Sequence, residues 1–358
     1  MQYKIDIEQV AVSSREQFEI EKTPMGIIFT DHMFICEYKD GEWVNPAIRP
    51  LGPVMMHPSA MALHYGQAIF EGLKATLNHK GEPVLFRAAD NASRLNVSAE
   101  RMAMPAFPED LFMQALNTLI SIESDWIPKS KGSSLYVRPF MFADEGFTGM
   151  RAAKSYKFMI FCTPAGPFFS RRIKLFAETK YIRAAHGGTG EAKAAGNYAA
   201  AIRPTELAKA NGYDQVLWLD AQNFEQIMEV GTMNIFFKIN REFITPSLDG
   251  CVLAGITRDS VIQLLRHQGY KVTERPVSIH EIITAMENGK LEEAFGTGTA
   301  VGIARIEEIG YLDRIIRFPA GNPVADQVNQ ALDEIKSQLI PDPFGWVSEV
   351  PENQFVSA

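Results

Sequence analysis

The chain has 358 residues, of which 46% are hydrophobic and 22% charged, and its formal net charge at pH 7 is −8. This composition excludes a wholly disordered chain, and the acidic balance argues against a nucleic-acid partner, which would need a basic face. The sequence has no run of 18 apolar residues and begins without an apolar signal segment, so we expect no membrane partner and a cytoplasmic protein.

Cysteine and histidine are too scattered to indicate a disulfide framework or a metal site. Cys36, Cys162 and Cys251 lie far apart, and no pair has the spacing of metal ligands. The seven histidines form no HExxH-type pattern. We therefore expect buried, reduced thiols and no bound metal.

Strand patterns dominate the first part of the chain, and two helices interrupt them. Apolar runs bounded by turn residues predict strands at residues 26–29, 33–38, 68–75, 84–87, 134–140 and 156–162. An imperfect helical spacing covers residues 90–102. Pro108, followed by two acidic residues, begins a second helix with an apolar stripe from Leu111 to Ile120.

The segment Thr-Pro-Ala-Gly-Pro at residues 163–167 interrupts both periodicities and is the best candidate for a domain boundary. Beyond it, strands and helices are mixed more evenly. We expect strands at residues 174–176 and 216–219, and helices that end at residue 210 or cover residues 257–268, 278–288 and 324–339.

Lys193 is a single lysine among small residues, in the segment Gly-Gly-Thr-Gly-Glu-Ala-Lys-Ala-Ala-Gly-Asn-Tyr at 187–198. A lone lysine is ordinarily a solvated helix residue, and a P-loop is excluded because Ala194 stands where Ser or Thr is needed. The small neighbours would let a bulky planar group approach the amine, which could then form a Schiff base with an aldehyde cofactor.

Three other segments hold groups that such a cofactor needs. Glu229 lies in a loop before a strand, and a pyridine ring needs a carboxylate beside its nitrogen. A glycine turn leads into the helix that contains Thr257, and amides at a helix start bind phosphate. Residues 296–302 could hold a further oxyanion. As a dinucleotide loop they would indicate a nicotinamide-dependent dehydrogenase, but their G-x-G-x-x-x-G spacing does not match. Together the four segments provide the set that pyridoxal phosphate requires.

Six motifs in order resemble the branched-chain amino-acid aminotransferases, within the fold-type IV pyridoxal-phosphate enzymes. They are Tyr-Gly-Gln-Ala-Ile-Phe-Glu-Gly-Leu-Lys-Ala at 65–75, Leu-Tyr-Val-Arg-Pro at 135–139, Lys-Ala-Ala-Gly-Asn-Tyr at 193–198, Glu-Val-Gly-Thr-Met-Asn at 229–234, Gly-Ile-Thr-Arg at 255–258 and Gly-Thr-Ala at 298–300. The resemblance implies an α+β chain of the two-domain, D-amino-acid-aminotransferase-like fold. We expect a small N-terminal α/β domain at 1–163, a linker at 164–174, and a larger β-barrel-like C-terminal domain with flanking helices, which binds the cofactor, at 175–358.

The resemblance also implies roles for single residues. Lys193 would hold pyridoxal 5'-phosphate and move the substrate proton, Glu229 would pair with the ring nitrogen, and Tyr198 would bond to the ring hydroxyl oxygen. The phosphate would be bound by Arg94, by the amides of Ile256 and Thr257, and by Thr299.

For the substrate, the resemblance places Thr299 and the amide of Ala300 near the α-carboxylate. Phe29, Tyr65 and Phe70 would line an apolar pocket, while Tyr136 and Arg138 would receive the second carboxylate of glutamate. Tyr65 would come from the neighbouring subunit, which implies a homodimer.

The implied activity is a ping-pong transfer of the amino group of L-leucine, L-isoleucine or L-valine to 2-oxoglutarate. Alternatives of the same fold are a D-amino-acid aminotransferase and an aminodeoxychorismate lyase. A binding module without activity is a further alternative, against which the joint presence of Lys193, Glu229 and Tyr198 argues. Val301 and Ala304 stand where some relatives carry C-x-x-C, so we expect no thiol switch.

Overall fold

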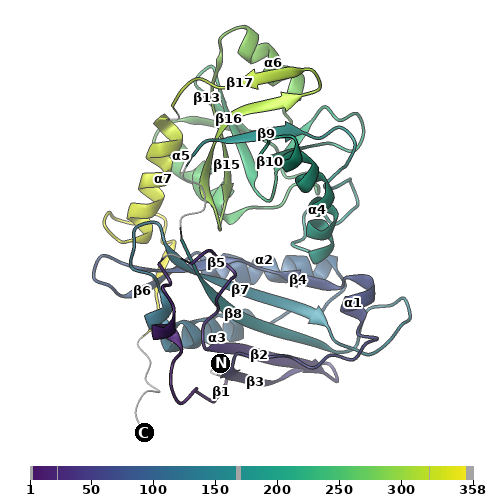
Figure 1. Ribbon diagram of the computed structural model, residues 1–358, viewed down its shortest axis with the longest axis vertical. Coiled ribbons are helices and arrows are strands. Elements are labelled where there is room, and N and C mark those ends of the chain that lie inside the picture. Colours follow the sequence, from purple (N-terminus) through teal and green to yellow (C-terminus); the bar gives the residue numbers. More distant parts are fainter. Residues whose placement is uncertain (1–2, 22, 167–170, 322, 352–358) are drawn as a thin grey trace. The chain divides into compact units, whose positions relative to one another are not determined.

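The computed structural model describes residues 3–21, 23–166, 171–321 and 323–351. The chain divides into two compact units, which Figure 1 colours along the sequence. The first unit comprises Met1–Phe168 and Asp333–Ala358, and the second comprises Phe169–Leu332. The division therefore falls within the expected linker at 164–174, of which residues 167–170 lie outside the described residues. The end of the chain, which the sequence grouped with the second domain, is assigned to the first unit.

In its described residues, the first unit contains one nine-stranded sheet, three complete α-helices and the end of a fourth. The sheet has the order β1-β3-β2-β8-β7-β5-β6-β18, with β4 paired to β7. Its strands are β1 (Asp6–Ile7), β2 (His32–Lys39), β3 (Glu42–Pro50), β4 (Ala68–Phe70), β5 (Leu73–Leu77), β6 (Pro83–Phe86), β7 (Ser134–Ala143), β8 (Tyr156–Ala165) and β18 (Val347–Glu349). Its helices are α1 (Met61–Tyr65), α2 (Ala88–Arg101) and α3 (Glu109–Ile122), with 3-10 turns at Arg15–Gln17 and Ser124–Trp126.

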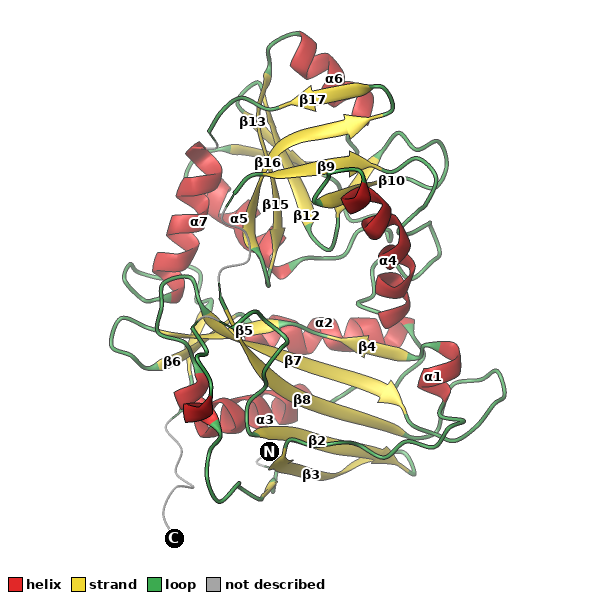
Figure 2. Ribbon diagram, in the orientation of Figure 1, coloured by secondary structure: helices red, strands yellow, loops and turns green. Residues whose placement is uncertain are grey.

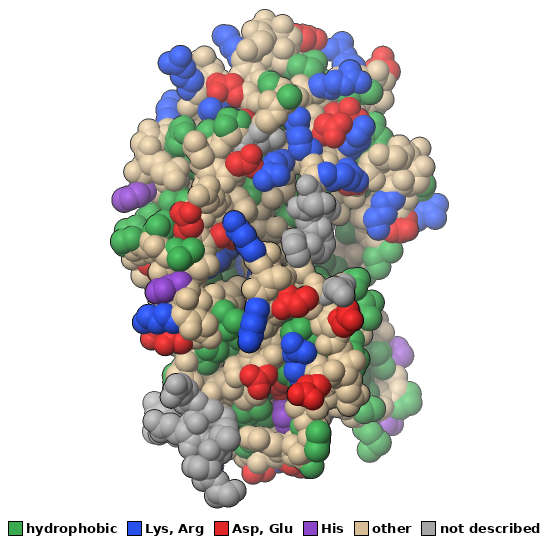
Figure 3. All heavy atoms as spheres, turned by 60° about the vertical axis from the view of Figure 1, so that its left-hand side comes forward, with side chains coloured by type: hydrophobic (Ala, Val, Ile, Leu, Met, Phe, Trp, Pro, Cys, Tyr) green, Lys and Arg blue, Asp and Glu red, His purple; other side chains and the backbone are tan. Residues whose placement is uncertain are grey.

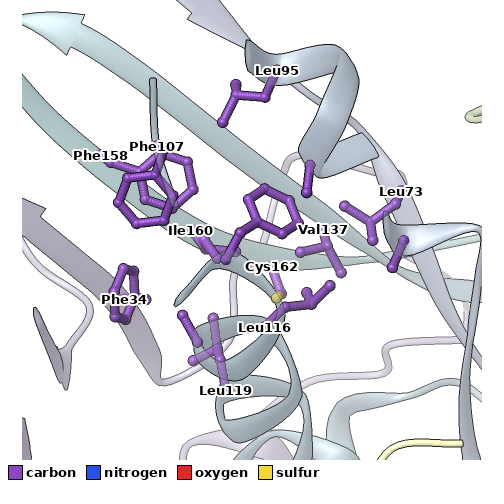
Figure 4. Close-up of a cluster of buried hydrophobic side chains, with 14 of the residues drawn as sticks. Phe34, Leu73, Leu95, Phe107, Leu116, Leu119, Val137, Phe158, Ile160 and Cys162 are labelled. Carbon is purple, nitrogen blue, oxygen red and sulfur yellow. The ribbon is translucent and has the colours of Figure 1, made fainter. Parts of the chain in front are cut away.

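Helices α2 and α3 pack against one face of this sheet (Figure 2). Figure 4 shows Leu95 of α2 and Leu116 of α3 among side chains from the central strands. The side chains of strand β7 alternate between the two faces of the sheet, as successive side chains of a strand do. Val137 lies in this core, whereas Tyr136 and its second neighbours along the strand face the other side. The alternation therefore places the predicted substrate residues of β7 on the face opposite α2 and α3.

Two of the predicted strands differ from the structure. Residues 26–29 form a turn and irregular chain, because Gly26 has a φ of 83° and its N–H donates to the Thr163 hydroxyl. The predicted strand 68–75 is divided into β4 and β5. Glu71 separates them, since its carboxylate turns into the protein and is fully buried. A run of apolar residues cannot reveal either interruption.

The second unit contains another nine-stranded sheet, with the order β11-β10-β9-β16-β15-β12-β13-β14 and β17 paired to β16. Its strands are β9 (Ile173–Ala177), β10 (Gln215–Leu219), β11 (Ile227–Val230), β12 (Asn234–Ile239), β13 (Glu242–Thr245), β14 (Lys271–Glu274), β15 (Leu291–Gly298), β16 (Gly302–Tyr311) and β17 (Arg314–Arg317). The helices that begin in it are α4 (Ala195–Ala210), α5 (Ile256–His267), α6 (Ile279–Glu287) and α7 (Pro323–Lys336). The α+β class is thus confirmed, and the four predicted helices are present with boundaries shifted by a few residues.

The described surface mixes charges of both signs. On the face drawn in Figure 3, acidic and basic side chains are interspersed. Within the described residues, no helix is both long and apolar enough to cross a bilayer.

Candidate active site

Lys193 is presented by a rigid loop immediately before α4. Its Nζ donates a hydrogen bond of 2.9 Å to the hydroxyl of Tyr198, on the first turns of that helix. Asn197 fastens the loop, because its side-chain amide donates to the carbonyls of Thr189 and Ala192 at 2.7 and 2.9 Å. The hydroxyl of Thr189 in turn donates to the Asn197 side-chain oxygen at 2.6 Å. Asn197 therefore explains how a loop rich in glycine and alanine can hold one amine in a fixed position.

Glu229, which the sequence placed in a loop before a strand, lies within strand β11. Its carboxylate is buried and has three partners. Its Oε2 lies 2.8 Å from Nε of Arg183, while Oε1 accepts the Leu253 N–H at 2.7 Å and the Asn234 amide at 3.4 Å. Arg183 also donates to the carbonyls of Cys251 and Gly190, at 2.7 and 3.2 Å. This guanidinium consequently joins Glu229 to the loop that leads to Lys193.

Burial raises the pKa of the Glu229 carboxyl above its ordinary value, and neighbouring groups oppose that rise. The largest opposing effect comes from Arg183, and the positive charge of Lys193 acts in the same direction. The structure thus brings together the predicted amine and the predicted carboxylate within one electrostatic environment. Such a carboxylate is suited to hold a proton on a basic ring nitrogen.

The predicted phosphate site lies at the start of α5. Ile256 and Thr257 occupy its first turn, the end of the helix toward which the backbone N–H groups point. Gly255 forms the N-cap without a side-chain bond, and a Cβ there would come within 2.0 Å of the Asn234 side-chain oxygen. Only glycine therefore lets the helix start approach Asn234, which also contacts Glu229. Amides at a helix start favour an anion such as phosphate.

The turn between β15 and β16 carries Thr299 and Ala300. Two residues earlier, Thr297 is 1% exposed, and its hydroxyl has no hydrogen-bond partner among the described residues. Thr297 is paired with Asn234 across the two strands, so both side chains lie on the same face of the sheet. A buried hydroxyl without a partner costs free energy unless a bound group satisfies it.

In the first unit, Arg138 and Tyr136 form a polar pair on the face opposite the helices. Arg138 Nη2 donates to the Tyr136 hydroxyl at 3.1 Å, and its guanidinium lies 4.5 Å from the centre of the Phe70 ring. The Arg138 Nε is buried and without a hydrogen-bond partner in the described part of the chain. Gly72 packs against the Tyr136 hydroxyl so closely that a Cβ would lie 2.1 Å from it. An aromatic surface with one such guanidinium can accept either an apolar side chain or a carboxylate.

Phe29 and Tyr65 are the more exposed members of the predicted substrate group. Phe29 is 39% exposed and packs edge to face on Phe161, with ring centres 5.5 Å apart. Tyr65 ends α1, is 40% exposed, and donates from its hydroxyl to the Thr148 carbonyl. Both rings thus lie at the surface of the first unit.

Arg94 of α2 binds a carboxylate within its own unit. Its Nε and Nη2 lie 2.8 and 2.7 Å from the two oxygens of Glu71, and the Glu71 carboxylate also accepts the Asn91 amide at 2.8 Å. This two-point ion pair fixes the guanidinium in the first unit. The predicted contact of Arg94 with a phosphate remains an expectation.

Sequence patterns had not indicated Arg183, Asn234, Asn197 or Glu71 as members of the site. Asn197, Asn234 and Glu71 stand inside quoted motifs, which gave them no role, and Arg183 stands outside all six. Their roles depend on contacts between segments that are distant in the sequence, as between Arg183 and Glu229. The signal that could have found them is the need of every buried charge for a partner.

Comparisons with known proteins agree on one family. The family described as "Amino-transferase class IV" matches residues 68–309. The chain is 44% identical to "Branched-chain-amino-acid aminotransferase 2" of Bacillus subtilis (strain 168), over 91% of each protein. It is 38% identical to "Branched-chain-amino-acid aminotransferase" of Mycobacterium tuberculosis (strain CDC 1551 / Oshkosh), over 95% of each. A crystal structure of the Escherichia coli branched-chain amino acid aminotransferase superposes with a TM-score of 0.73 and 25% identity, covering 90% of this chain and 99% of that one.

Proposed function

The chain belongs to the class IV aminotransferases, and from this premise we propose that it is a pyridoxal-phosphate-dependent branched-chain amino-acid aminotransferase. It transfers the amino group of L-leucine, L-isoleucine or L-valine to 2-oxoglutarate in two half-reactions. The observation that carries the proposal is the joint presence of a fixed amine, Lys193, and a buried carboxylate, Glu229, in one electrostatic environment.

Three features of the second unit fit the cofactor. The amine of Lys193 is held by Tyr198, the buried hydroxyl of Thr297 lacks a partner among the described residues, and the first turn of α5 offers amides to a phosphate. These groups match an aldehyde, a polar substituent and a dianion in turn. A small phosphorylated pyridine aldehyde therefore suits the donor set.

When bound, pyridoxal phosphate supplies an aldehyde that condenses with amino groups and a ring that withdraws electrons from the substrate α-carbon. Lys193 would hold the cofactor through its amine and would move the proton of the substrate α-carbon. Glu229 would hold a proton on the ring nitrogen, and Arg183 favours the charged form of Glu229. Tyr198 would donate to the ring hydroxyl oxygen. A positioned base of this kind contributes about 10²–10⁴-fold to the rate.

The remaining contacts are those that the resemblance to the family implies. The amides of Ile256 and Thr257, with Thr299, would hold the phosphate, and the resemblance alone gives Arg94 the same role. Thr299 and the amide of Ala300 lie near the substrate α-carboxylate. The apolar side chain of the substrate is received by an aromatic group made of Phe29, Tyr65 and Phe70. The Tyr136–Arg138 pair receives the second carboxylate of glutamate, because its buried guanidinium nitrogen needs a partner.

We also assign the protein a homodimeric state, with Tyr65 given to the site of the neighbouring subunit, and a cytoplasmic location. The exposure of Tyr65 on α1 and the three buried free thiols support these assignments. Sedimentation equilibrium tests the homodimeric state, and a fully active monomer would overturn that assignment.

The central test compares Lys193→Ala with Lys209→Ala, a matched change of an exposed lysine at the end of α4. Only the first variant should lose both the visible absorbance of the bound cofactor and the turnover. Wild-type absorbance and turnover in Lys193→Ala would refute the proposal. A panel of L-leucine, L-isoleucine, L-valine, L-phenylalanine, D-alanine and aminodeoxychorismate then separates this activity from the alternatives of the same fold. Preference for D-alanine or aminodeoxychorismate would replace the substrate assignment.

A further inference from the structure

Three residues of the second unit that the proposed reaction does not use lie close together. One ring nitrogen of His186, one carboxylate oxygen of Asp249 and the Sγ of Cys251 all lie within 4.8 Å of one another. The three belong to two loops that are separated by 60 residues or more in the sequence. No spacing rule could therefore reveal them, and the expectation of no metal rested on such rules alone.

Hydrogen bonds within the cluster orient two of its side chains. His186 Nδ1 lies 3.2 Å from the carbonyl of Asp249, which can only accept, so in the neutral ring Nδ1 carries the proton and the lone pair is on Nε2. The carboxylate Oδ1 of Asp249 accepts the Cys251 N–H at 2.9 Å, which leaves Oδ2 available. The two available atoms, Nε2 and Oδ2, are 3.9 Å apart. Metal-binding histidines are commonly fixed in this way, through the nitrogen that does not bind the metal.

The cluster borders a cavity of about 380 Å³ that is contained in the second unit. All three residues line it, together with Met228 of β11 and Val252, the residue after Cys251. The His186 side chain is 64% exposed, whereas Cys251 is buried, so the cluster spans from solvent to the protein interior. A ligand entering from solvent would thus meet nitrogen, oxygen and sulfur donors on one wall.

We propose that His186, Asp249 and Cys251 bind a Zn²⁺ ion, with a fourth position open to water in the cavity. A tetrahedral zinc ion holds nitrogen, oxygen and sulfur ligands at about 2.0–2.3 Å, so its ligand atoms are separated by about 3.3–3.8 Å. The observed separations, of up to 4.8 Å, exceed that range, so binding requires the ligand atoms to draw together by up to about 1 Å. Cys251 binds as the thiolate, and its proton passes to solvent. The mixed donor set selects zinc over Mg²⁺ and Ca²⁺, which prefer oxygen alone.

The test titrates the metal-free holoenzyme with Zn²⁺ in competition with a chromophoric chelator. We expect one ion per chain, and an affinity that falls at least about tenfold in both Cys251→Ser and His186→Gln. His280→Gln is the matched control, because His280 also has a carboxylate at 3.9 Å, that of Glu225, and contributes to no three-residue cluster in the described part of the chain. That variant should bind as the wild type does.

A second measurement uses Cd²⁺ as a spectroscopic substitute for Zn²⁺. The wild type should gain an ultraviolet thiolate-to-metal absorption that Cys251→Ser lacks, while Mg²⁺ should produce none. Thermal melts establish that the variants fold, and if Cys251→Ser does not, the exposed His186→Gln carries the comparison. Absence of stoichiometric Zn²⁺ binding, or equal binding by the wild type and His186→Gln, would overturn the proposal. Because binding is measured without turnover, its failure leaves the aminotransferase assignment untouched.

Discussion

The guanidinium of Arg183 donates from Nε to Glu229 Oε2 across 2.8 Å, and both side chains are at least nine-tenths withdrawn from solvent. Burial raises the pKa of the Glu229 carboxyl, and Arg183 is the strongest of the groups that oppose this rise. The charge of the carboxylate therefore depends on one neighbouring cation. A charged Glu229 is the form that can hold a proton on a ring nitrogen.

Replacing Arg183 by Gln should raise the pKa of Glu229 further, because the nearest positive charge is removed. At a given pH a smaller fraction of Glu229 is then ionised, so kcat should fall by about tenfold, or about 1.4 kcal/mol. The acidic limb of the pH–kcat profile should move to higher pH. Arg183→Lys keeps the charge and should move the limb less. Superimposable profiles for the wild type and Arg183→Gln would contradict this role.

Gly72→Ala should displace the Tyr136 ring, because the new Cβ would lie 2.1 Å from its hydroxyl oxygen and 2.9 Å from Cζ. Arg138 would lose its bond to that hydroxyl, so KM for 2-oxoglutarate should rise by about tenfold, with a smaller change for L-leucine. Steady-state kinetics with each substrate measure the difference. The added Cβ should also lower the stability, and overpacking of this kind typically costs about 1–3 kcal/mol. In the double variant with Tyr136→Phe, the hydroxyl oxygen nearest to the new Cβ is absent, so part of the lost stability should return. Equal losses for the two substrates would show that the pair does not bind the second carboxylate.

Gly255→Ala should weaken cofactor binding by about tenfold. The added Cβ would come within 2.0 Å of Asn234 Oδ1 and push apart the start of α5 and the side chain that contacts Glu229. The weaker binding is measured as the amount of cofactor that the protein retains after dialysis, monitored through its visible absorbance. Gly52→Ala is the control, since nothing lies within 4 Å of a Cβ at that position. Full retention in Gly255→Ala would show that the helix start tolerates a side chain.

Asp220→Ala should destabilise the second unit in a pH-dependent manner. Burial pushes the pKa of Asp220 upward, but four backbone N–H groups, of residues 222, 223, 225 and 226, outweigh it and hold the pKa below its ordinary 3.8. Because the folded pKa is lowered, this stabilisation is present above pH 3.8 and is lost as the pH falls through the folded value. We expect a loss of about 1 kcal/mol at pH 7, since the carboxylate is partly solvated. Denaturant unfolding should show this difference narrowing below pH 3.8, and a constant difference would contradict the assignment.

Local patterns predicted much of the fold because periodicity reports which residues are buried. The stripe from Leu111 to Ile120 is indeed the buried face of α3, and β7 and β8 contain the predicted strands. The exceptions arose where one long-range contact overrides the local pattern. Residues 26–29 are held by the Thr163 hydroxyl, and Glu71 breaks a strand to meet Arg94 and Asn91.

The candidate site was predictable to the extent that its chemistry is concentrated in single residues. Lys193 and Glu229 could be named because four segments together offer an amine, a carboxylate and two oxyanion sites, although each segment alone has an ordinary explanation, and the family resemblance strengthened both. Arg183 could not be named, since an arginine in a loop has no distinguishing pattern until the buried carboxylate it meets is known. The group of His186, Asp249 and Cys251 could not be predicted either, because its members come from two loops that only the folded chain brings together.

The return of the chain to the first unit affects how the protein is made. Strand β18 pairs with β6 through Val347 and Phe86, and the Arg87 N–H donates to the Trp346 carbonyl at 2.8 Å. A ribosome delivers these residues after the whole uninterrupted stretch of the second unit has emerged. The second unit can thus fold during translation, whereas the edge of β6 in the first unit stays unpaired until β18 has been synthesised. For that interval the nascent chain exposes an open strand edge, the kind of surface that chaperones shield from aggregation.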